Sequence, residues 1–137
     1  MAWLTCGVLD GLSALISANF RWMRLFQFLA SGILGPSAFN GGVATALMGI
    51  GIHFFVALGA ATVYYFASRL LPFLITRALV FGPLYGVAVH LFMSFVVIPL
   101  SNVAKRPFAL RGFLIGLGIH MVVVGPSIAL TLRRYLR

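Results

Sequence analysis

The sequence from Gly82 to Ser94 reads Gly-Pro-Leu-Tyr-Gly-Val-Ala-Val-His-Leu-Phe-Met-Ser. Gly82, Gly86, His90 and Ser94 recur at four-residue steps, so on a helix they form one stripe, and the rest of the stretch is apolar. Small residues in such a stripe let two helices of a membrane protein approach closely. The stretch therefore predicts a membrane-spanning helix that packs against a neighbour and carries a histidine at the contact.

The whole chain has the composition of a membrane protein. Of its 137 residues, 62% are hydrophobic and 8% are charged, which is too little charge to cover the surface of a soluble domain. No charged residue occurs in residues 25–68, 78–104 or 112–132. Each interval exceeds the roughly 20 residues that cross a bilayer core. The sequence therefore predicts an all-α, polytopic membrane protein.

The apolar runs predict one transmembrane domain, residues 1–137, built as a bundle of four spanning helices. The expected spans cover about residues 3–20, 42–68, 77–100 and 108–132. An amphipathic interfacial helix is expected at about residues 20–31, because its polar and aromatic residues lie on opposite faces. Residues 32–42 are rich in helix breakers, so either a surface loop or a re-entrant segment is expected there.

The basic residues are expected to contact lipid. The formal charge of +9 comes from ten Lys and Arg against the single acid Asp10, but these residues only punctuate hydrophobic runs. Anionic lipids are therefore the expected partner, and nucleic acid is not. The predicted headgroup contacts are Arg21, Arg24, Lys105, Arg106, Arg133 and Arg134. Aromatic belts are expected at Trp3, Trp22, Tyr64, Tyr65 and Tyr135.

The histidine stripe occurs three times. His53 follows Gly49 by four residues, as His90 follows Gly86 and His120 follows Gly116. Each histidine lies near the middle of its expected span, and Asp10 lies near the middle of the first. Because antiparallel helices preserve midpoint depth, these four ionisable side chains could converge at one level. The glycines expected at helix contacts are Gly49, Gly82, Gly86, Gly112 and Gly116.

An ionisable residue inside a membrane span is costly, and so it indicates a functional site. The favoured hypothesis is a proton- or cation-handling channel or transporter-like oligomer that uses Asp10, His53, His90, His120 and the neighbouring Ser94. Alternatively, the three histidines bind a metal ion, or two of them bind a haem axially. A third hypothesis is a non-catalytic lipid-binding or scaffold subunit of a larger membrane complex, with the histidines as interhelical contacts.

Two further features limit the choice of function. Cys6 is the single cysteine, so neither an internal disulfide nor a cysteine-based metal motif is possible. Ser94 shares a stripe with His90 but has no acid partner for a catalytic triad. No phosphate loop or dinucleotide fingerprint occurs. An enzyme is therefore the less favoured alternative.

From His53 to the C-terminus the chain resembles the YagU-like bacterial inner-membrane proteins, a family of unknown function. The residues that carry the resemblance are His53, Phe55, Tyr64, Pro72, the glycine stripe leading to His90, then Ser94, Phe95, His120, Arg133 and Arg134. The first forty residues match less clearly, and the chain lacks the large polar insertion of that family. The resemblance implies a bacterial inner-membrane location with cytoplasmic termini, and it supplies no activity. The basic residues divide equally between the two expected sides, so charge alone does not orient the chain.

Overall fold

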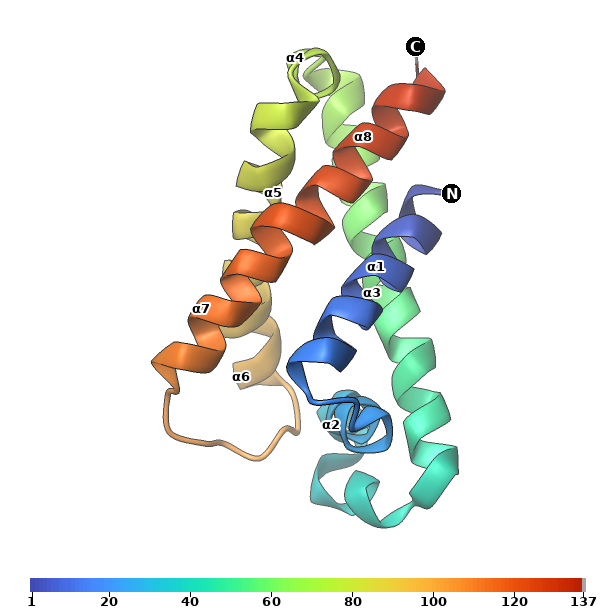
Figure 1. The fold of residues 1–137 in the computed structure, drawn as a ribbon, viewed down its shortest axis with the longest axis vertical. Coiled ribbons are helices and arrows are strands. Elements are labelled where there is room, and N and C mark those ends of the chain that lie inside the picture. Colours follow the sequence, from blue (N-terminus) through green and yellow to red (C-terminus); the bar gives the residue numbers. More distant parts are fainter. Residues whose placement is uncertain (137) are drawn as a thin grey trace.

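The computed structural model describes residues 1–136, so Arg137 lies outside it, and all regular structure in this range is helical (Figure 1). The elements are α1 (Ala2–Ser17), α2 (Trp22–Leu34), the 3₁₀ helix η1 (Gly35–Asn40), α3 (Gly42–Leu70), α4 (Phe73–Thr76), α5 (Ala78–Phe92), the π-helix η2 (Met93–Val97), α6 (Ile98–Leu100), α7 (Leu110–Ile119), the π-helix η3 (His120–Val124) and α8 (Gly125–Leu136). The predicted all-α class is confirmed.

Three continuous helices are long and apolar enough to cross a membrane. They are Gly42–Leu70, Ala78–Leu100 and Leu110–Tyr135. Helix α1 has 16 residues, or about 24 Å of helix rise, which is short for a bilayer core of about 30 Å. It reaches the required length only together with α2 and η1, from which it is bent by 116°. These findings are compatible with a multi-pass membrane protein.

The long helices lie side by side, and the two chain ends lie toward the same end of the bundle (Figure 1). Helix α4 is also at that end. Helix α2 and the connection between α6 and α7 are at the other end, where α2 is seen along its axis because it runs across the bundle. Asn102 in this connection donates a side-chain hydrogen bond to the Ile33 carbonyl, 2.8 Å away, and so joins the connection to α2.

The turn between α1 and α2 explains why α1 ends at Ser17, earlier than the sequence suggests. Asn19 and Phe20 have φ values of 50° and 57°, a left-handed conformation that stops a helix. Helix α2 then continues to Leu34, and residues 35–40 form a 3₁₀ helix. The segment expected as a loop or re-entrant dip is therefore partly helical, because the glycines end α2 without preventing another turn.

Glycines allow the closest helix crossings. A Cβ on Gly49 would collide with the backbone carbonyl of Phe26 in α2, and a Cβ on Gly86 would collide with that of His120. A Cβ on Gly82 would lie 3.1 Å from Pro126 Cα. In contrast, nothing lies within 4 Å of a Cβ on Gly112. The prediction that Gly112 packs against a helix is wrong, because Gly112 lies on an open side of the first turn of α7, whereas the adjacent Phe113 packs against His90 of α5.

Tyrosine side chains bind α3 to its neighbours inside the bundle. Tyr64 is 1% exposed, and its hydroxyl donates to the Leu74 carbonyl at 2.9 Å. Tyr85 in α5 donates to the Ala60 carbonyl at 2.6 Å, and the two tyrosine rings lie 4.8 Å apart. The expectation that Tyr64 belongs to an interface belt is therefore wrong. Its hydroxyl finds a buried backbone acceptor, as a buried tyrosine requires.

Candidate functional site

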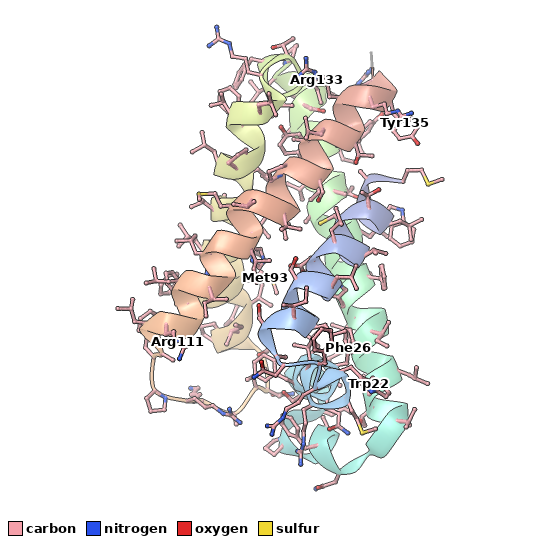
Figure 2. The ribbon with its side chains drawn as sticks, viewed as in Figure 1. Trp22, Phe26, Met93, Arg111, Arg133 and Tyr135 are labelled. Atoms are coloured by element: carbon pink, nitrogen blue, oxygen red, sulfur yellow. The ribbon has the colours of Figure 1, made fainter. Side chains whose placement is uncertain are left out.

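A cavity of about 430 Å³ lies between the helices. Its walls come from α1, α2, α3, α5, α7 and both π-helices, and most of its lining side chains are apolar. Figure 2 shows two lining residues at different heights, Phe26 on α2 and Met93 near the middle of the bundle. The five residues proposed from the sequence to handle a proton or cation all line this cavity, namely Asp10, His53, His90, Ser94 and His120.

Asp10 and His53 form the first polar pair. The nearest carboxylate oxygen, Oδ2, lies 3.9 Å from His53 Nδ1, and the side chains are 21% and 12% exposed. His53 Nε2 lies 2.8 Å from the carbonyl oxygen of Gly7. A carbonyl oxygen only accepts hydrogen bonds, so Nε2 carries a proton and donates. In the neutral ring, Nδ1 then presents a lone pair toward the Asp10 carboxyl group.

This arrangement sets two hydrogen-bond acceptors opposite each other, 3.9 Å apart. An ionised carboxylate and an imidazole lone pair are both acceptors, so their proximity is stabilised when a proton, another cation or a hydrogen-bond donor lies between them. Glycines on α1 make room for the pair. A Cβ on Gly11 would lie 3.4 Å from His53 Nε2, while a Cβ on Gly7 would lie 2.7 Å from the Phe54 ring. The Phe54 ring packs against His53 with 5.5 Å between centroids.

His90 and His120 form the second pair. Their ring centroids are 4.9 Å apart, and the centroid of the Phe113 ring lies 4.8 Å from that of His90. His120 Nδ1 donates to the Gly116 carbonyl at 2.8 Å, so His120 Nε2 keeps its lone pair in the neutral ring. His90 is 7% exposed, and within residues 1–136 its Nε2 is buried without a hydrogen-bond partner. An unpartnered buried polar atom is rare and calls for an explanation.

The two π-helices adjoin the second pair, since η2 begins at Met93, three residues after His90, and η3 begins at His120. The Ile98 N–H donates a hydrogen bond to the Met93 carbonyl, and the Gly125 N–H donates one to the His120 carbonyl. Each acceptor lies five residues before its donor, which is the π-helix pattern. Each π-helix ends two residues before a proline, Pro99 or Pro126. A proline ring clashes with the carbonyl four residues earlier, so a wider turn relieves the clash at that point. Such π turns occur often at functional sites.

The expected three-histidine metal site is not formed. Among residues 1–136, no group of three or more His, Cys, Asp or Glu side chains is close enough to hold a metal ion. His53 is held against α1 by its bond to Gly7, whereas His90 and His120 meet at the crossing of α5 and η3. His90 and His120 do not form the expected pair of axial haem ligands. Their rings, 4.9 Å apart, are in ordinary aromatic contact and leave no room for a porphyrin between them.

The basic residues lie toward the two ends of the bundle. Figure 2 shows Arg111 at the same end as Trp22, and Arg133 with Tyr135 at the other end. Arg21 and Arg24 are exposed at the start of α2, where Arg24 lies 5.6 Å from the Phe39 ring centroid. Lys105 and Arg106 are exposed in the connection before α7, and Arg133 and Arg134 are in the last turn of α8.

Comparisons with protein-family models, curated proteins and solved structures find no match for this chain. The site is therefore interpreted from its own geometry. That geometry adds two parts that the sequence reasoning missed, the cavity wall formed by α2 and the π turns after His90 and at His120. A proline nine residues after His90 and six after His120 was a usable signal for the π turns.

Proposed function

We propose that this protein handles protons as a small channel- or transporter-like membrane protein. One observation carries the proposal. His53 and His120 are held by backbone carbonyls in tautomers that leave one free lone pair each, and both line the cavity that also contains Asp10 and His90. When one nitrogen of an imidazole ring donates to a carbonyl, the other nitrogen is the one that can take up a cation.

A proton is the cation that best suits these pairs. Protonation of His53 gives an imidazolium next to the Asp10 carboxylate, and protonation of Asp10 gives a neutral donor facing His53 Nδ1. Either form sets a donor opposite an acceptor across the 3.9 Å gap, so a proton can move between the groups when they close to hydrogen-bonding distance or through one bridging water. A hydrated metal cation would lose most of its water ligands in a cavity with mainly apolar walls, which is costly.

The proposal places the chain in a bacterial inner membrane with cytoplasmic termini, as the YagU-like resemblance implies. Four passes would then consist of the three long helices and α1, with α2 lying at the interface. Both chain ends lie toward one end of the bundle, as an even number of passes requires. A homo-oligomer is part of the proposal, since the exposed apolar faces of so small a bundle leave ample surface for helix contacts.

Proton flux in liposomes tests this function. The purified protein is reconstituted with an internal pH-sensitive dye, and a potassium diffusion potential drives protons across the membrane. We expect flux in the parent and a loss of about tenfold or more in Asp10→Asn or His53→Gln, because each removes a proton-accepting group from the cavity. Thr62→Ala is the matched control, since Thr62 is exposed on the helix that carries His53.

The outcomes separate the competing functions. A parent without flux, or unaltered flux in each of Asp10→Asn, His53→Gln, His90→Gln and His120→Gln, rejects proton handling. If those variants also fold and assemble normally, the scaffold or lipid-binding alternative is favoured instead.

A metal ion bound by His90 and His120 is the second candidate. It is favoured by the buried, unpartnered Nε2 of His90 and by the lone pair on His120 Nε2. Imidazole suits copper and zinc, and additional ligands would have to come from Ser94 or from the metal's own small ligands. Metal analysis of protein purified without chelator decides between the two candidates. Stoichiometric copper or zinc that is lost in His90→Gln would establish the metal, and a metal-free preparation with proton flux would eliminate it.

A further inference from the structure

We propose that the cavity binds an organic ammonium ion with an apolar body, in exchange for a proton. This inference rests on the proton-handling function proposed above and assigns a ligand class to the same cavity. Three observations carry it, namely the apolar walls and size of the cavity, its single carboxylate, and the acceptor character of the imidazole nitrogens nearby.

The walls define the body of the ligand. Ligand-binding cavities typically measure about 300–1,000 Å³ and combine apolar walls with a few well-placed polar groups. The cavity here measures about 430 Å³, and most of the side chains that line it are aliphatic or aromatic, many of them on α2 and α3. Such walls favour a ligand of which most atoms are carbon.

The polar groups define the head of the ligand. Asp10 is the only acidic residue in the chain, and it lines the cavity. Oδ2 of Asp10 and Nδ1 of His53 are 3.9 Å apart, and both accept hydrogen bonds when His53 is neutral. A primary ammonium group has three N–H donors, so one such group can donate to both atoms and supply the positive charge that the carboxylate needs.

No positive charge in the cavity opposes such a ligand. Among the described residues that line it, none is a lysine or an arginine. The other titratable groups that line the cavity with Asp10 are Cys6 on the same helix, His53 on α3, His90 on α5 and His120 on η3. None of these side chains carries a permanent positive charge, unlike lysine or arginine. Because arginines lie at both ends of the bundle, an ammonium amphiphile would reach the cavity more easily from the bilayer than from water.

The exchange with a proton follows from charge balance. In the proton-loaded state of the proposed function, the Asp10–His53 pair holds one proton, on either residue. When the ammonium ion binds between the two groups, that proton leaves to water, and the carboxylate then pairs with the ammonium. One cation replaces another, so the net charge of the cavity is unchanged and one proton is released for each ligand bound.

Binding of three eight-carbon probes tests the proposal. Octylammonium, octanol and octanoate share one apolar body and differ only in the head group. Each is titrated into the full-length protein in phosphatidylcholine nanodiscs, with empty nanodiscs as the background for partition into lipid. We expect octylammonium to bind about 10–100-fold more tightly than the other two, and to release about one proton per site into a weakly buffered solution.

A variant series identifies the site. Asp10→Asn should abolish the preference for octylammonium and the release of the proton, while Thr62→Ala should retain both. Val89→Trp is a second variant that fills the cavity without removing a charge, and it should weaken all three probes together. Equal binding of octanol or octanoate, or binding of octylammonium that survives Asp10→Asn, would overturn the proposal.

The result is distinguishable from failure of the proposed function. Proton flux that is present in liposomes but unaffected by octylammonium leaves proton handling intact and rejects the ligand. Absence of flux together with tight, Asp10-dependent binding of octylammonium rejects proton conduction and retains the ligand site.

Discussion

The imidazole rings of His90 and His120 lie 4.9 Å apart, with their planes at 54°, where η3 crosses α5. Two glycines make this proximity possible. The backbone of His120 contacts Gly86 in a space that has no room for a Cβ, and a Cβ on Gly116 would lie 2.7 Å from His90 Cε1. The pair is therefore fixed by the backbones of the two helices, and changes at these glycines should affect packing and site together.

The first prediction concerns this helix crossing. Gly86→Ala should force α5 and η3 apart and lower the free energy of unfolding by about 1–3 kcal/mol, as overpacking does elsewhere. Thermal unfolding in detergent, followed by tryptophan fluorescence, measures the effect. Gly59→Ala is the control, since nothing lies within 4 Å of a Cβ at Gly59. Equal stability of the two variants would contradict the crossing.

The second prediction concerns the coupling between Asp10 and His53. If they share one proton, removing either residue should reduce proton flux by nearly as much as removing both. Asp10→Asn, His53→Gln and the double variant therefore form a double-mutant cycle, and flux in liposomes is the measurement. If the fold-loss of flux in the double variant equals the product of the two single fold-losses, the residues act independently despite their 3.9 Å separation.

The third prediction concerns the π turn that begins at His120. Pro126→Ala removes the clash with the carbonyl four residues earlier, so the turn can tighten to an α-helix. Tightening rotates His120 away from His90, because one residue of an α-helix turns by about 100°. Proton flux should fall toward the level of His120→Gln while stability is maintained or rises. Pro72→Ala, in the turn before α4, should leave flux unchanged. Unaltered flux in Pro126→Ala would separate the π turn from the function.

The fourth prediction concerns the basic residues at the start of α2. Replacing both Arg21 and Arg24 with Gln should weaken the preference for anionic over zwitterionic vesicles, by about 1 kcal/mol for each charge removed. The protein is held in nanodiscs and mixed with vesicles of phosphatidylglycerol or phosphatidylcholine. The fraction that sediments with the vesicles at low and at high salt measures this preference. Exposed charges are screened by salt, so the difference from the parent should shrink at high salt. A difference that persists at high salt would indicate loss of the packing of Arg24 on Phe39 instead.

The amino-acid sequence by itself determined the class of this protein. Long uncharged apolar runs can be stable only as helices in a medium without water, so the all-α class and the long helical segments follow from composition and length. The stripe from Gly82 to His90 indicated a close helix contact, because only glycine leaves the backbone exposed there, and the partner backbone does lie against Gly86.

Only the tertiary structure decided which atoms meet. Periodicity gives the face of a helix, but not its neighbour or its rotation, so the separation of the histidines into a pair with Asp10 and a pair with each other was not predictable from spacing. The same limit explains Gly112, which repeats the stripe although nothing lies within 4 Å of a Cβ built on it. It also explains Tyr64, whose hydroxyl donates to the Leu74 carbonyl in α4. The tautomers of His53 and His120 likewise depend on carbonyl groups that only the folded backbone brings within hydrogen-bonding distance.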